Sequence, residues 1–133
     1  MTKFLLLQNY EGGEGVEPMT NWASEDIKAH IEFQQTLNEE LTDSGELVDA
    51  QALTGPELAR IVTGDGVSAP VVTDGPFPES KEFLAGYRMV DVETPERAAE
   101  IAAKISAAPG PGGAPIRQPI EVRQMMSAPG GDL

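Results

Sequence analysis

The sequence contains no cysteine and only one histidine, His30. Without cysteine the chain cannot form disulfides, thiolate nucleophiles or cysteine-rich zinc sites. A single histidine excludes a metal site built from several histidines of one chain. The acidic residues also lack the spacing of an EF-hand loop. We therefore expect neither a bound metal nor a cofactor.

Basic residues are scarce: nine lysines and arginines stand against 22 aspartates and glutamates, which gives a net charge of −13. Nucleic acids and anionic membranes attract proteins through basic side chains. We therefore expect no nucleic-acid partner and no membrane attachment. The N-terminal apolar run at 4–7 is too short for a signal peptide or a membrane span. Together with the missing cysteine, this favours a cytoplasmic location.

The length of 133 residues favours one domain, which we place at 1–126, with a loose tail at 127–133. Short apolar runs bounded by glycine and proline predict strands. These strands lie at 3–10, 46–53, 83–92 and 120–125, with two more inside 57–75 around a turn at 64–66. Helical spacing predicts helices at 24–45 and 94–108. The helix-end signals are Ser24 and Thr94 as N-caps, Pro95 at a first helical position and Gly45 just past a helix end.

The order of these elements, β-α-β-β-β-β-α-β, predicts an α+β fold. We expect a ferredoxin-like antiparallel sheet with both helices on one face and an added hairpin. One layer of helices leaves the other face of the sheet bare. A homodimer with its two sheets facing each other would cover that face.

The helix at 24–45 carries two polar residues, His30 and Gln34, in the middle of its apolar face. That face is otherwise formed by Ile27, Ile31, Phe33, Leu37 and Leu41. One interpretation is a core histidine with satisfied hydrogen bonds. The other is a titratable group in a pocket between helix and sheet, acting as general acid or base. Such a histidine needs an orienting carboxylate, for which Asp49 and Asp74 are the candidates.

The segment Asp74-Gly75-Pro76-Phe77 ends the strand predicted at 69–74, and its residue types favour a tight corner. We expect this strand to join the sheet that His30 and Gln34 face. The corner then either has only a structural role, with Phe77 filling an apolar gap, or it forms one wall of the pocket or part of the dimer interface. We assign catalysis to His30 and Asp74. Ligand contacts are assigned to Gln34, Phe77, Lys81, Tyr87 and Trp22.

The segment "VTDGPFPESKEFLAGY" at 72–87 resembles the signature of the DGPF group of YCII-related proteins. The resemblance implies a ferredoxin-like fold and a dimeric α+β barrel, but little about a reaction. Simple YCII-like proteins carry a helix histidine thought to work with an aspartate, and a few relatives are small-molecule lyases or dehydrochlorinases. Counting back from Gly45, that histidine position is Gln34 here, with His30 one turn earlier.

Two hypotheses follow. The first is a protein that binds a small organic molecule in the helix–sheet pocket, with or without lyase-like acid–base catalysis. The second is a non-enzymatic regulatory or accessory protein, because genes of the DGPF group often neighbour those of extracytoplasmic-function sigma factors. An acidic surface would attract a basic partner. The sequence does not decide between them.

Overall fold

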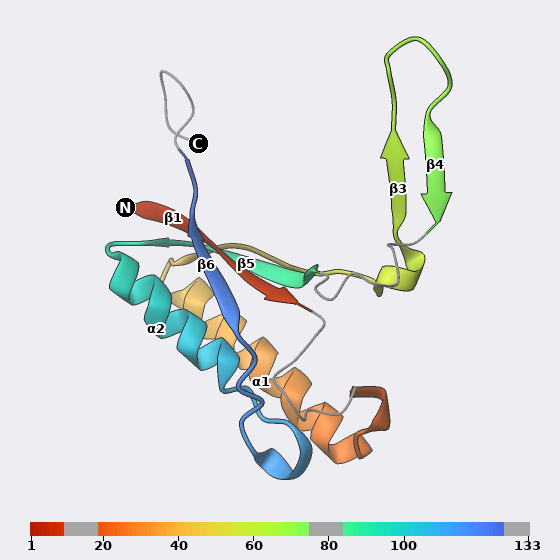
Figure 1. Cartoon of the computed structure of the whole chain (residues 1–133). Coiled ribbons are helices and arrows are strands. Elements are labelled where there is room, and N and C mark those ends of the chain that lie inside the picture. Colours follow the sequence, from red (N-terminus) through yellow and green to blue (C-terminus); the bar gives the residue numbers. More distant parts are fainter. Residues whose placement is uncertain (10–18, 75–83, 127–133) are drawn as a thin grey trace.

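The computed structural model describes residues 1–9, 19–74 and 84–126 of the chain (Figure 1). The elements are β1 (Thr2–Asn9), α1 (Ser24–Asp43), β2 (Leu47–Ala52), β3 (Arg60–Thr63), β4 (Val71–Asp74), β5 (Leu84–Val92), α2 (Pro95–Ser106) and β6 (Ile120–Gln124). Four of the strands form an antiparallel sheet in the order β2-β5-β1-β6. Both helices lie on one face of this sheet, which confirms the predicted α+β class and agrees with a ferredoxin-like fold.

The core lies between this sheet and the two helices. Alternate residues of β5 are buried, and cross-strand pairing sets Val90 opposite Phe4 on the helix-facing side. Leu6, Val90 and Val92 are fully buried, and each such side chain contributes roughly 1.5–3 kcal/mol through removal from water. The helices complete this cluster with Leu37, Leu41, Ala98, Ile101, Ala102 and Ile105.

The helix-end signals of the sequence are largely confirmed. Gly45 has a positive φ of 80°, and the Glu46 amide donates to the Leu41 carbonyl, which closes α1 with a Schellman-type end. Thr94 accepts from the Arg97 amide at the start of α2. The N-cap prediction for Ser24 was wrong, because the cap position is Ala23 and no side chain caps the helix there.

Ile31 was placed wrongly on the sheet-facing side of α1, because it is 47% exposed. The buried residues of this helix are Leu37 and Leu41, and the half-buried positions beside them include His30 and Gln34. Each step along a helix turns the side chain by about 100°. Ile31 is therefore rotated out of the stripe that contains its neighbour His30.

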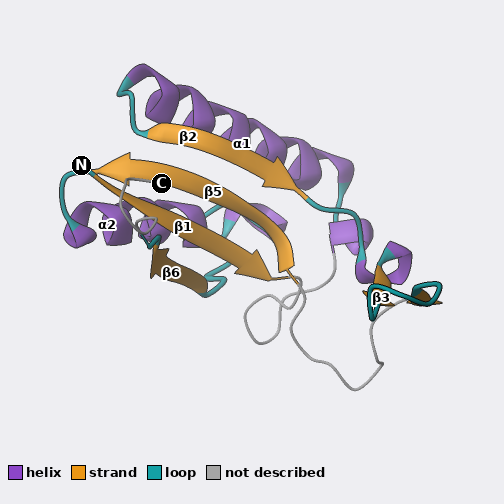
Figure 2. Cartoon of the chain, turned by 90° about the horizontal axis from the view of Figure 1, so that it is seen from above, coloured by secondary structure: helices purple, strands orange, loops and turns teal. Residues whose placement is uncertain are grey.

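The strands β3 and β4 form a separate hairpin, so the prediction that the strand at 69–74 joins the main sheet was wrong. The predicted turn at 64–66 is present, with Asp65 Oδ1 accepting from the amides of Val67 and Ser68. Figures 1 and 2 show the hairpin beyond the end of the main sheet, projecting on the side away from the helices. Its strand residues are exposed throughout.

The second face of the main sheet is not covered by a helix of the described part of the chain (Figure 2). Leu5 pairs with Met89 there and Leu7 pairs with Tyr87, all four half-buried. No helix in the described ranges combines the length and hydrophobicity needed to cross a membrane.

Candidate functional site

A row of polar side chains runs along the sheet-facing side of α1. His30, Gln34 and Asn38 follow one another at intervals of four residues, which places them on one line along the helix. All three are half-buried. Arg88 meets this row from β5, where the alternation of the strand points it toward the helices together with Val90. Its exposure of 4% makes it part of the interior.

The Arg88 guanidinium is held by three neutral amide oxygens. Nη2 donates to Gln34 Oε1 at 2.6 Å and Nε to Asn38 Oδ1 at 2.7 Å. Nη1 makes a longer bond of 3.4 Å to Gln8 Oε1, from the end of β1. No carboxylate of the described residues forms an ion pair with it. Burial lowers the pKa of Arg88 from its usual value, but a guanidinium remains charged in proteins.

The hydrogen bonds of His30 have a fixed direction. Its Nδ1 lies 3.0 Å from the Pro109 carbonyl, which can only accept, so Nδ1 carries the proton. Arg88 can only donate, so the oxygen of the Gln34 amide faces Arg88 and its nitrogen faces His30. Gln34 Nε2 then donates over 3.3 Å to His30 Nε2. These contacts describe a neutral imidazole whose Nε2 lone pair points along the row.

An aromatic side chain borders the histidine. Trp22, 9% exposed, packs against the His30 ring edge to face, with 5.5 Å between centroids and 82° between planes. The imidazole is therefore fixed by Trp22, the Pro109 carbonyl and the Gln34 amide. In chemical terms, Nε2 of such a neutral imidazole can take up one proton if the Gln34 amide turns away.

In a comparison of the sequence with known families, the YCII-related domain matches residues 3–113, and the fold is consistent with this match. The chain belongs to the YCII-related domain family. No protein of curated function matches it.

In this YCII-related domain the two aspartates proposed to orient His30 lie elsewhere. A register shift in β2 between Leu47 and Asp49 turns Asp49 to the open face of the sheet. There Asp49 accepts from the Tyr87 hydroxyl at 2.9 Å, a bond that lowers the pKa of the carboxyl and raises that of the phenol. Asp74 is exposed at the end of β4, opposite Arg60.

The predicted ligand contacts divide into three groups. Trp22 and Gln34 are brought together around His30. Tyr87 lies on the opposite face of the sheet, next to Asp49. Phe77 and Lys81 fall outside the described residues, so the structure does not place them.

Sequence reasoning missed Arg88, Asn38 and Gln8. Two signals were present in the sequence. Asn38 continues the four-residue spacing of His30 and Gln34, and Arg88 interrupts the apolar alternation of its strand at a helix-facing position. Gln8 gave no such signal, because it stands at the end of its strand.

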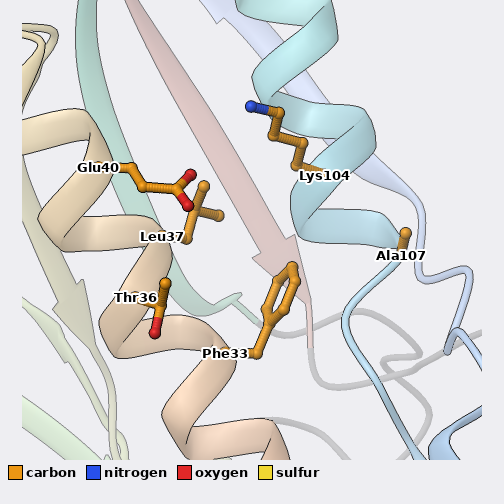
Figure 3. A pocket seen from close by; sticks show the side chains of 6 residues that line it. All are labelled: Phe33, Thr36, Leu37, Glu40, Lys104 and Ala107. Atoms are coloured by element: carbon orange, nitrogen blue, oxygen red, sulfur yellow. The ribbon is translucent and has the colours of Figure 1, made fainter.

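One hollow among the described residues lies between the two helices rather than at this row. It measures about 370 Å³, and Phe33, Leu37 and Glu40 of α1 point toward Lys104 and Ala107 of α2 (Figure 3). A second hollow surrounds Glu46 and Arg97. Neither includes His30, Gln34 or Arg88. Within the described ranges no group of three or more carboxylate, histidine or cysteine side chains is placed to hold a metal ion.

Proposed function

We propose that the protein binds a small organic molecule between α1 and the sheet, where His30 exchanges a proton with it. The observation that carries this proposal is the directed row in which Gln34 links the imidazole of His30 to the guanidinium of Arg88. Such a row combines a proton acceptor with a fixed positive charge. This pairing suits acid–base chemistry on a small molecule, of which a lyase-like elimination is one example.

The environment of the row supports the same proposal. Trp22 gives the histidine an aromatic neighbour, and aromatic surfaces favour flat organic groups. Gln34 occupies the position at which the family resemblance implies a histidine. His30, one helical turn earlier, then serves as the base in its place. Asp74 and Asp49 make no described contact with it, so the imidazole is oriented by the Pro109 carbonyl instead.

A thermal-shift screen of small organic acids and phenols tests this function. We expect at least one compound to raise the melting temperature of the wild type but not that of His30→Ala. Gln34→Ala should lose the effect as well. Gln35→Ala, at the neighbouring exposed position, is the matched control and should retain it. A compound that stabilises the wild type and His30→Ala equally would place its site elsewhere.

The open face of the sheet supports assembly as a homodimer. Leu5, Leu7, Tyr87 and Met89 form a half-buried apolar surface that no helix of the described residues covers. In a dimer with two-fold symmetry, this surface of one protomer would pack against the same surface of its partner, and the apolar side chains of both would be buried. This arrangement is the dimeric α+β barrel that the resemblance implies.

A second candidate function is regulation through a protein partner, and the β3–β4 hairpin favours it. An isolated two-stranded hairpin is marginally stable in water, yet Ile61, Val62, Val71 and Val72 are all exposed on it. A sigma factor of the extracytoplasmic-function type is the partner class that the DGPF resemblance suggests. This function predicts that the wild type binds a purified sigma factor of this type at low salt. It also predicts that Ile61→Asp loses that binding. Equal behaviour of Ile61→Asp and wild type would contradict it.

We also assign the chain to the DGPF group and to the cytoplasm. Within the signature, Thr73 and Asp74 end the exposed strand β4, and Leu84 begins β5. Residues 75–83 between these strands lie outside the described residues. Fractionation of cells that express the full chain tests the location. Recovery in the membrane or secreted fraction would contradict it.

A further inference from the structure

The interior of the protein holds one charged side chain among the described residues, that of Arg88. A buried charge normally has a counter-charge, because its removal from water is costly. The sequence offers 22 acidic residues, and none of those described is paired with this guanidinium. The site therefore carries a positive charge that the described part of the chain leaves unneutralised.

The described residues also leave the hydrogen bonds of Arg88 incomplete. A guanidinium has about five N–H donors, and the described residues provide three acceptors. Nη1 is the least well bonded nitrogen, because its contact with Gln8 is 3.4 Å long. Nη1 and Nη2 form the edge of the guanidinium to which a carboxylate binds with two parallel bonds. Here two side-chain amides, Gln8 and Gln34, occupy that edge.

We infer that the ligand of this site is an organic carboxylate whose two oxygens bind Nη1 and Nη2 of Arg88. This inference rests on the proposed function and specifies its substrate class. Gln34 and Gln8 are half-buried. Rotation about their side-chain torsions would move both amides off this edge of the guanidinium. The displaced Gln34 amide can then donate to the carboxylate. A single guanidinium fits a planar monoanion, and no second Lys or Arg of the described residues bonds to the row.

The inference also gives Gln34 a positioning role between ligand and base. While its oxygen accepts from Arg88, its nitrogen faces His30 and keeps Nε2 unprotonated. Once a carboxylate takes the place of that oxygen on Arg88, the Gln34 amide is free to turn its oxygen toward His30. His30 Nε2 can then carry the proton that it removes from the ligand. Arg88 is the only charged group of the described residues in hydrogen-bond contact with this row.

Matched pairs of acids and amides test the inference on the full chain. Acetate, benzoate and phenylacetate would be titrated by calorimetry at constant ionic strength, each beside its uncharged amide. We expect at least one acid to bind ten times or more tightly than its amide. Gln34→Glu places a carboxylate of the chain against Arg88 and should weaken that acid at least tenfold. Arg123→Gln, at a side chain that is 71% exposed, is the control for unspecific attraction and should bind as the wild type does.

The results separate this inference from the proposed function. If acids and amides bind equally and His30→Ala abolishes both, the function stands and the carboxylate inference is overturned. If Gln34→Glu stays folded and binds the acid as well as the wild type, the inference is also overturned. If no acid and no amide binds, the carboxylate inference is overturned. The thermal-shift screen, which also contains phenols, then decides the proposed function, and a screen without a stabilising compound overturns it as well. Arg88→Lys keeps the charge but loses the two parallel bonds, and an unchanged affinity in that variant would contradict the bidentate geometry.

Discussion

Arg88 Nη2 donates a 2.6 Å hydrogen bond to the amide oxygen of Gln34, and the nitrogen of the same amide lies 3.3 Å from His30 Nε2. A buried cation and the single histidine of the chain are thus joined through one neutral side chain. With its oxygen turned to Arg88, the amide presents its nitrogen to His30, so a protonated Nε2 would face a second donor. The charge state of the histidine and the occupancy of Arg88 are therefore linked.

The first prediction concerns the counter-charge that Arg88 lacks among residues 1–9, 19–74 and 84–126. Gln34→Glu should raise the free energy of unfolding at pH 7 by about 1.5–3 kcal/mol, the range for a hydrogen bond to a charged group. Urea denaturation measures the change. Gln35→Glu, on the exposed neighbouring residue, should stay within about 0.5 kcal/mol of the wild type. A less stable Gln34→Glu protein would contradict this prediction.

The second prediction separates a functional histidine from a structural one. His30→Ala removes the bond to the Pro109 carbonyl and the contact with Trp22, so we expect a loss of about 1–2 kcal/mol with the fold retained. Circular dichroism checks that the fold is retained, and denaturant titration measures the change in the free energy of unfolding. Asn38→Ala, eight residues along the same face, is a comparison that also removes a partner of Arg88. Unfolding of His30→Ala at room temperature would support the core-histidine interpretation.

The third prediction concerns acid stability. Glu46 accepts from Arg97 Nε at 2.8 Å and from Arg97 Nη2 at 2.9 Å, and these bonds lower the pKa of Glu46 from 4.5 to about 2. A depressed carboxyl pKa stabilises the fold above the unfolded value, and this contribution is lost as pH falls from about 4.5 toward 2. Glu46→Gln should therefore cost about 1–2 kcal/mol at pH 7, because partial exposure of the pair screens it.

The pH dependence provides the control for this pair. The difference between wild type and Glu46→Gln should shrink as the pH falls below about 4.5 and be small near pH 2. Glu100 is the other partner of Arg97, and the side chain of Glu100 is 64% exposed. Glu100→Gln should therefore change the free energy of unfolding much less than Glu46→Gln does. A Glu46→Gln difference that is constant from pH 7 to pH 2 would contradict an ionic origin.

The fourth prediction concerns the open face of the sheet. Leu7→Asp places a charge among the apolar side chains that we assign to the dimer interface, so the dimer should dissociate at least tenfold more readily. Sedimentation equilibrium measures this association. Ile31→Asp, on an exposed position of α1, should leave it unchanged. A wild type that sediments as a monomer would contradict the homodimer itself.

The elements of the fold were predictable because their signals are local. Thr94 caps α2 by accepting from the amide of Arg97, three residues later, and Gly45 ends α1 by adopting a positive φ. The partner of a strand is not a local property. Val71 and Val72 favour a strand whichever strand lies beside it. The sequence therefore did not show that β4 pairs only with β3 among the described strands.

The candidate site was predictable only in part, for the same reason. The helical period was enough to set His30 and Gln34 on the sheet-facing side. The register shift beside Val48 was not visible, and it turns Asp49 away from the histidine. Arg88 interrupts the apolar alternation of β5, but that signal becomes a site only once it is known which face of the strand meets the helices.

The most direct test of the proposed site is a nuclear magnetic resonance titration that observes arginine Nε–H groups and side-chain amides while a carboxylate is added. Benzoate and its amide are the probes, at constant ionic strength. We predict saturable shifts of the Arg88 Nε–H and Gln34 amide signals with benzoate, and no shifts at Arg123 or Gln35. Shifts confined to exposed groups such as Arg123, with Arg88 and Gln34 unchanged at every concentration, would contradict a carboxylate site between α1 and the sheet.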